Sequence, residues 1–256
     1  MVKGMGLPAE FYLSAEYYLE QLAAESARLR EVAELGLDAP VPSCPGWTVE
    51  SVVRHVAQVY LHKTEVLRLG ALPKPWPPEG IDERDAFELY DESLSALTAA
   101  LRQAGTTQQT WTFSPADSTS GFWYRRMAME TVVHRIDAEL AHDVVTPIAA
   151  ELALDGIDEL LYPNLGGPWW DENWTKHPLD ATVRITAEGR SWTVHADATS
   201  VTVLQGAEGE ADAEIFGDPG AVYLWLWGRT SDDAVQFTGS EDVVREFRGR
   251  LTEATQ

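Results

Sequence analysis

Two side chains in the stretch 127–142 have types and spacing suited to holding a metal ion. Glu130 and His134 are four residues apart, and the stretch contains neither glycine nor proline, which favours a helix. Residues four apart in a helix lie on one face, one turn from each other. Catalytic zinc sites commonly use three nitrogen or oxygen ligands and leave a fourth position open. The pair alone is also typical of a solvated helix face, so a third ligand is required, and His55 is the best candidate.

Four helical patterns are available to position these residues. Apolar residues recur at helical spacing over about 14–35, 49–69, 83–104 and 121–142, with Ser14 and Thr48 as plausible N-caps. Proline and glycine at 42–46 and the proline-rich run 73–78 separate the helices. His62 lies about 10 Å along the second helix from His55, too far to share an ion easily. The pattern predicts a four-helix bundle, in which ligands come from facing helices.

The pattern changes after Pro147. One more helix is predicted over about 152–161, followed by an irregular, tryptophan-rich segment at 162–177. Short alternating runs rich in valine, isoleucine and threonine predict strands at 181–187, 191–195, 200–204, 211–216 and 235–238. Helices are predicted at 218–227, where Asp precedes Pro, and at 240–251. We therefore expect two domains, a bundle over 1–148 and a small α+β domain over 149–256.

Composition excludes several classes of function. The chain has 256 residues, 45% of them hydrophobic, and a net charge of −22, which argues against nucleic acid or an anionic membrane surface as the main partner. No signal peptide is recognisable, and no apolar run reaches the roughly 18 residues of a membrane span. A single cysteine, Cys44, excludes an internal disulfide and fits a cytoplasmic protein. We expect Cys44 to be a buried structural thiol.

Two motifs resemble a known family. The run Pro-Ser-Cys-Pro-Gly-Trp-Thr-Val at 42–49, leading to His55, resembles the N-terminal domain of the mycothiol-dependent maleylpyruvate isomerase family, as does Glu-Thr-Val-Val-His-Arg-Ile-Asp-Ala-Glu at 130–139. This domain is a DinB-like metal-binding bundle. The segment 211–229 and Gly239 look like the family's small C-terminal domain, which is related to sterol-carrier folds. The fold class expected is therefore α+β with two domains, a DinB-like four-helix bundle and a sterol-carrier-like α+β domain.

The resemblance implies a site and a chemistry. The family's zinc ligands match His55, Glu130 and His134, and a catalytic arginine of its C-terminal domain is matched by Arg229. The cofactors implied are Zn²⁺, or another divalent metal, and mycothiol, whose thiol the metal activates. The function implied is that of a thiol S-transferase or a maleylpyruvate-isomerase-like enzyme acting on a small electrophile. The alternative is a non-catalytic metal- or small-ligand-binding protein on the same scaffold.

Other residues have structural interpretations that compete with functional ones. We expect a surface position for Asp137, although it lies where it could orient His134. Arg135 is expected in a structural ion pair, Trp47 in the core, and His62 and His142 at the surface or rim. The tryptophans Trp169, Trp170 and Trp174 suit either a domain interface or an aromatic pocket. The sequence indicates neither the substrate nor the oligomeric state.

Overall fold

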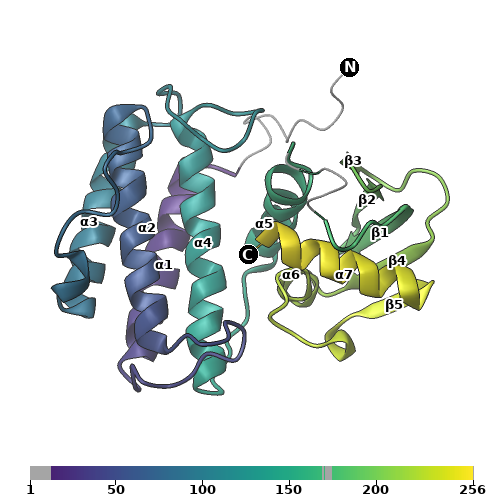
Figure 1. Cartoon of the computed structure of the whole chain (residues 1–256), viewed down its shortest axis with the longest axis horizontal. Helices are drawn as coiled ribbons and strands as arrows, with labels where there is room; N and C mark the ends of the chain where they lie inside the picture. The colour runs from purple at the N-terminus through teal and green to yellow at the C-terminus, as the bar shows by residue number, and fades with distance from the viewer. Residues whose placement is uncertain (1–12, 169, 171–174, 256) are drawn as a thin grey trace. The chain divides into compact units, whose positions relative to one another are not determined.

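The structure is a computed structural model that describes residues 13–168, 170 and 175–255. Two compact units are present. The helical unit spans Ala9–Phe113 and Asp117–Thr146, and the C-terminal unit includes Ser114–Ala116 and Pro147–Gln256. Figure 1 labels their elements. A four-helix bundle and a C-terminal α+β fold are both present, so the predicted fold class is confirmed.

The bundle consists of α1 (Ala15–Ala33), α2 (Val49–Leu69), α3 (Ala86–Ala104) and α4 (Ser120–Ala141), with a 3-10 turn η2 at Ile81–Glu83. The capping residues explain where the helices begin. The Ser14 hydroxyl accepts a hydrogen bond from the Tyr17 amide, and Thr48 and Ser51 form a reciprocal capping box at the start of α2. Predicted and observed helix ends agree within a few residues.

The four helices form two parallel pairs that run in opposite directions. Arg54 and Gln108 bond the backbone carbonyls of Arg84 and Leu67, so the starts of α2 and α3 are adjacent and so are their ends. Arg28 and Glu25 pair with Glu139 and Arg135 in the same order along α1 and α4. The long connection 70–85 makes the parallel α2–α3 arrangement possible, because a short loop can only return the chain antiparallel.

Aliphatic and aromatic side chains fill the bundle, and two polar networks cross it. Tyr60 bonds the hydroxyls of Ser26 (3.0 Å) and Thr131 (2.6 Å). The fully buried Glu139 accepts hydrogen bonds from Arg135 (2.7 Å) and Arg28 (2.7 Å) and from the Thr146 amide and hydroxyl. Arg135 therefore has the structural role expected of it. Burial raises the pKa of Glu139, but these hydrogen bonds outweigh burial and hold the pKa below its ordinary value.

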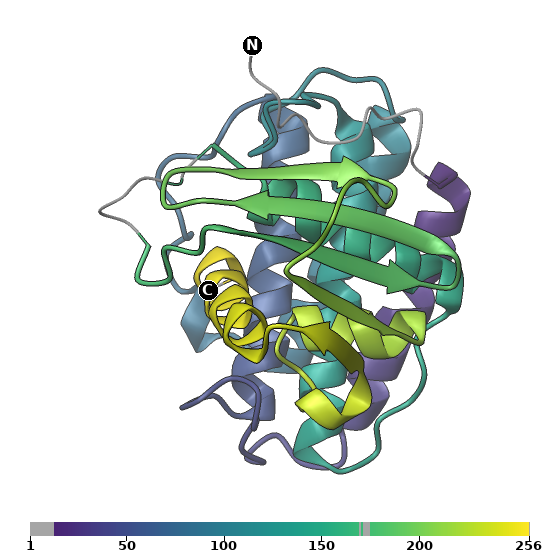
Figure 2. The same cartoon turned by 90° about the vertical axis from the view of Figure 1, so that its right-hand side faces the viewer.

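The C-terminal unit contains a five-stranded sheet with the strand order β3-β2-β1-β4-β5. Figure 2 shows these strands side by side. The β1–β4 pair is parallel and the other pairs are antiparallel. The elements are α5 (Ala150–Glu159), a π-helical turn η3 (Leu160–Leu165), β1 (Ala181–Ala187), β2 (Arg190–Ala196), β3 (Val201–Gln205), β4 (Ala213–Gly217), α6 (Pro219–Leu226), η4 (Asp232–Ala234), β5 (Gln236–Gly239) and α7 (Glu241–Thr255).

One face of this sheet is buried, as the period-two pattern requires. Val183 pairs with Val194, and Ile185 pairs with Trp192 and Ile215, and all five are buried. The predicted hairpin is present, with Glu188 and Gly189 both at positive φ in its turn. Among the helices of the described residues, none is long and apolar enough to cross a membrane.

Candidate metal centre

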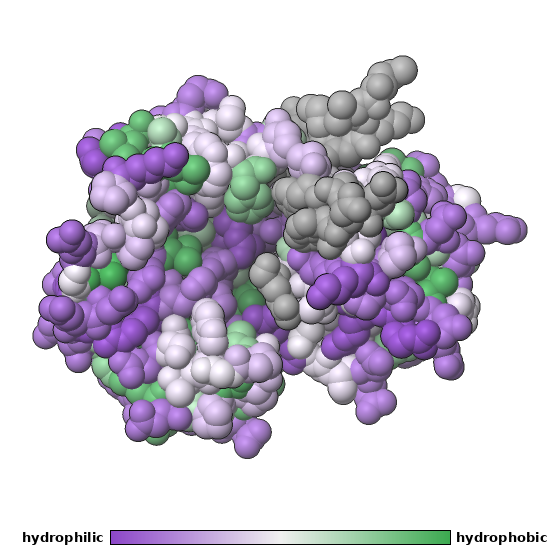
Figure 3. All heavy atoms as spheres, viewed as in Figure 1, coloured by the Kyte–Doolittle hydropathy of each residue, from purple (hydrophilic) through white to green (hydrophobic). Residues whose placement is uncertain are grey.

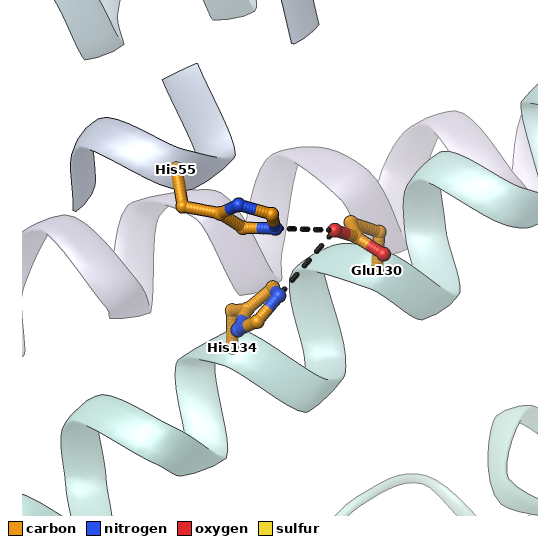
Figure 4. Close-up of side chains that lie close together, drawn as sticks. All are labelled: His55, Glu130 and His134. Atoms are coloured by element: carbon orange, nitrogen blue, oxygen red, sulfur yellow. Dashed lines mark hydrogen bonds and ion pairs between the residues drawn. The ribbon is translucent and has the colours of Figure 1, made fainter. Parts of the chain in front are cut away.

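The structure brings the three predicted ligands together. His55 comes from α2, and Glu130 and His134 come from α4, and one ligand atom from each lies within 4.8 Å of the others. Figure 4 shows the two imidazoles converging on one carboxylate. The His55 Nε2 and His134 Nε2 atoms lie 3.1 Å and 3.3 Å from Glu130 Oε1. The packing of α2 against α4, which no local sequence pattern shows, brings His55 to the other two predicted ligands.

The two oxygens of Glu130 have different partners. Oε1 faces both histidines, while Oε2 is in an ion pair with Arg126, one helical turn earlier on α4. Burial raises the pKa of Glu130, but the charge of Arg126 and the hydrogen bonds with His134 and His55 outweigh it, so the pKa is held well below its ordinary value. Glu130 is therefore an anion, and its ion pair with Arg126 restricts rotation of the carboxylate.

Asp137 fixes the orientation of His134. Asp137 Oδ2 lies 2.9 Å from His134 Nδ1, and Oδ1 accepts a 2.5 Å hydrogen bond from the Ser43 hydroxyl. The Cys44 thiol lies 3.6 Å from Oδ2. Asp137 is fully buried, so the expectation of a surface carboxylate was wrong. Cys44 is half-buried rather than buried, and it contacts the carboxylate that orients a predicted ligand.

The donor set fits a divalent cation. Asp137 holds Nδ1 of His134 and so directs Nε2 toward Glu130, the arrangement typical of metal-binding histidines. Burial lowers the pKa of His134, but hydrogen bonds to Asp137 and Glu130 and their charges raise it to about 9. The negative charges of Glu130 and Asp137 therefore favour a positive charge at His134. A metal ion bound to Nε2 would supply this charge in place of the imidazolium proton.

Access to the triad is from the His55 side. The His55 side chain is 37% exposed, whereas the side chains of Glu130 and His134 are 12% and 11% exposed. The Trp47 ring centroid lies 5.1 Å from that of His55 and 6.2 Å from that of His134. Trp47 is half-buried rather than part of the core, and it restricts the movement of both imidazoles.

Other predicted residues lie elsewhere. Arg229 belongs to the C-terminal unit, where its Nη1 donates to the Trp227 carbonyl at 2.7 Å. Trp170 is buried in the same unit and donates to the Leu165 carbonyl at 2.6 Å. Trp169 and Trp174 lie outside the described residues. His62 and His142 are half-buried, and neither belongs to the triad.

Three residues around the triad were not identified from the sequence as parts of a site. Arg126 precedes Glu130 by four residues, a spacing that could have indicated the ion pair. Lys63 lies on α2 beyond His55, and the 42–46 loop supplies Ser43. For Lys63 and Ser43 no sequence signal exists, because their roles depend on the packing of separate segments.

Comparisons with known proteins agree with this architecture. The model of the family "Mycothiol maleylpyruvate isomerase N-terminal domain" matches residues 19–139, which include all three members of the triad. Two crystal structures of the mycothiol-dependent maleylpyruvate isomerase, one of them a histidine-to-alanine mutant, are 15% and 14% identical to the chain. Each has a TM-score of 0.61 and covers 91% of this chain and 95% of that chain, which shows a shared fold.

A further solved structure, "UbiJ-SCP2 Ubiquinone synthesis protein", is 20% identical, covers 43% of this chain and 96% of that chain, and has a TM-score of 0.31. Among curated proteins, none matches the sequence significantly. Residues 19–139 therefore match the family of the mycothiol maleylpyruvate isomerase N-terminal domain, and nearly the whole chain shares its fold with a mycothiol-dependent maleylpyruvate isomerase.

Proposed function

We propose that the protein is a metal-dependent enzyme that uses mycothiol to isomerise, or to conjugate, a small electrophilic substrate. The observation that carries the proposal is the convergence of His55, Glu130 and His134 on one point, with His55 partly exposed, in a domain of the mycothiol maleylpyruvate isomerase type. Zinc is the metal proposed, and the cytoplasm is the proposed location, because a low-molecular-weight thiol is kept reduced there.

A divalent ion held by His55, Glu130 and His134 would lower the pKa of a thiol and so supply a thiolate nucleophile for reversible addition to a double bond or for transfer. The protein's own residues prepare the site for this. Arg126 and Asp137 fix Glu130 and His134 before anything binds, which reduces the entropy lost on binding. Cys44 is not required as a nucleophile.

Arg229 is proposed to bind an anionic group of the substrate or of the thiol. Its guanidinium lies 5.9 Å from the centroid of the Trp227 ring and donates to the Trp227 carbonyl, and these contacts hold its side chain just beyond the end of α6. A planar guanidinium recognises a carboxylate by two parallel hydrogen bonds. Arg229→Lys is the informative variant, because it retains the charge and loses this geometry.

The test is turnover by zinc-loaded protein with mycothiol and maleylpyruvate, and in parallel with mycothiol and a simple electrophile. His134→Ala should lose bound zinc and turnover together, whereas His142→Gln, a change to another histidine near the end of the same helix, should retain both. Turnover by the metal-free protein would overturn the proposal. Zinc binding without turnover of any thiol and electrophile would instead favour a non-catalytic metal-binding protein.

A further inference from the structure

Lys63 is a half-buried lysine in an unusual position. It lies on α2 two turns beyond His55, and its ammonium nitrogen is 3.0 Å from His62 Nδ1 and 4.8 Å from the centroid of the Trp123 ring. Within the described part of the chain, no carboxylate is within ion-pair distance of this nitrogen. A half-buried ammonium is only partly hydrated, so its lack of a carboxylate partner calls for an explanation.

The groups around Lys63 hold it in place without neutralising it. Burial and, to a smaller extent, the charge of Lys63 lower the pKa of His62 to about 4, so His62 is neutral near pH 7 and its Nδ1 accepts a hydrogen bond. The edge of the His62 ring contacts Trp76 from the connection 70–85 (4.8 Å between centroids). An aromatic face and a neutral imidazole stabilise a cation only weakly compared with a carboxylate.

Lys63 also interacts electrostatically with a second cation, Arg126, and with the carboxylate of Glu130. Burial lowers the pKa of Lys63 to about 8; the carboxylate of Glu130 opposes this shift, and the guanidinium of Arg126 adds to it. Glu130 is already in an ion pair with Arg126 through Oε2, and its other oxygen faces the two histidines. Glu130 therefore interacts with Arg126 and with both imidazoles, and among the described residues it forms no ion pair with Lys63, whose ammonium can accept an anion as partner.

The direction of the helices places this positive charge beside the triad. Along α4, Arg126 precedes Glu130 by one turn, about 6 Å, and Trp123 lies one turn earlier still. α2 runs antiparallel to α4. Lys63 of α2 therefore lies opposite the turn of α4 that carries Trp123 and Arg126, whereas His55 lies opposite the turn that carries Glu130 and His134. A molecule that reacts at the triad and extends along the line of contact between α2 and α4 would therefore reach the Lys63 ammonium.

We propose that Lys63 is a specificity-determining residue that binds an anionic group, a carboxylate, of the electrophilic substrate. The inference rests on the proposed function, because it assumes that the electrophile reacts at the triad. The carboxylate accepts a charge-assisted hydrogen bond from the ammonium and supplies an ion-pair partner that no described residue provides. The site would then discriminate against uncharged electrophiles of the same shape, since these cover the half-buried ammonium without pairing with it.

The test measures binding of maleate, a simple dicarboxylate, by calorimetry, with its dimethyl ester as the uncharged comparison. Wild type, Lys63→Met, Lys63→Arg and Lys74→Met are compared, each with and without one equivalent of zinc. Methionine keeps the length and the apolar contact with Trp123, arginine keeps the charge, and Lys74 is an exposed lysine of the connection 70–85.

Lys63→Met should weaken maleate binding at least tenfold, and the arginine and Lys74 variants should weaken it less than threefold, because a hydrogen bond to a charged group accounts for a tenfold loss or more. The dimethyl ester should show no dependence on Lys63. In wild-type protein with isotope-labelled lysine, of which the chain has only four, maleate should raise the pKa of Lys63.

Equal maleate affinity in wild type and Lys63→Met, or no maleate binding by the wild type, would overturn the inference. This result is distinguishable from failure of the proposed function, because the binding measurement uses neither thiol nor turnover. Lys63-dependent binding of maleate in a protein that lacks thiol-dependent turnover would support the anion site and refute the enzyme. Turnover of mycothiol and maleylpyruvate with unchanged KM in Lys63→Met would refute the anion site and support the enzyme.

Discussion

Replacing Lys63 by methionine should stabilise the helical unit, because it removes a half-buried charge that forms no ion pair with a carboxylate of the described residues. The pKa of Lys63 is lowered from 10.5 to about 8. At about 1.4 kcal/mol for each pKa unit, the charged form costs the folded state about 3 kcal/mol. The attraction between the ammonium and Trp123 offsets roughly 0.5–1 kcal/mol of any gain in the variant. The net stabilisation expected at pH 7 is therefore about 2 kcal/mol.

The pH dependence gives this prediction its sign. The folded protein releases the Lys63 proton near pH 8 and the unfolded chain near 10.5, so the cost is fully present below pH 8 and disappears as the pH rises to about 10.5. Urea unfolding followed by far-ultraviolet circular dichroism should show Lys63→Met more stable than wild type at pH 7 and nearly equal to it above about pH 10. Lys74→Met, an exposed change, should leave stability unchanged at both pH values.

Two results would refute this reasoning. A Lys63→Met variant less stable than wild type at pH 7 would mean that the ammonium is favourably paired in the folded protein. A stability difference that stays the same from pH 7 to about 10.5 would mean that the charge is not its cause. A stabilising substitution beside the triad would show that Lys63 is retained for binding at the expense of stability, which functional sites commonly require.

Three further predictions concern the surroundings of the site and the C-terminal unit. Asp137→Asn should lower zinc affinity roughly 10–100-fold by weakening the hold on His134, measured by chelator competition, while Ser43→Ala should have a smaller effect in the same direction. Glu139→Gln should destabilise the bundle by roughly 3 kcal/mol at pH 7. The difference in unfolding free energy between wild type and variant should shrink below pH 4.5, because a carboxylate with a lowered pKa contributes stability that is lost as acid protonates it. Gly156→Ala should destabilise the C-terminal unit by about 1–3 kcal/mol in thermal unfolding, because the added carbon would lie 2.5 Å from the Tyr223 ring. Unchanged values in these three measurements would remove the roles assigned to Asp137, Glu139 and Gly156 respectively.

The sequence predicted those parts of the fold that depend on neighbouring residues. Ser14 and Thr48 begin α1 and α2 as expected, and Asp218 accepts hydrogen bonds from the Gly220 and Ala221 amides at the start of α6. The spacing of Glu130 and His134 is a property of any helix, so their shared face followed without knowledge of the packing. The alternating strands likewise predicted which face of the sheet is buried.

The sequence did not predict the parts that depend on the packing of distant segments. α4 is buried along most of its length, including Arg135, Asp137 and Glu139. A charged residue in a helix is normally read as exposed, so this burial is invisible to a periodicity argument. The parallel direction of α2 and α3, the contact of Lys63 with Trp123 and the position of Trp47 against both histidines depend on how separate helices and loops meet.

The most direct test of the central claim is elemental analysis of the purified protein, with wild type measured beside His55→Ala. The metal-centre proposal predicts about one zinc ion per chain in the wild type and almost none in the variant, because α2 contributes no other ligand to the triad among the described residues. His62→Ala, a change on the same helix, should retain the ion. No zinc in the wild type after incubation with the metal, or equal zinc in wild type and His55→Ala, would contradict the proposal.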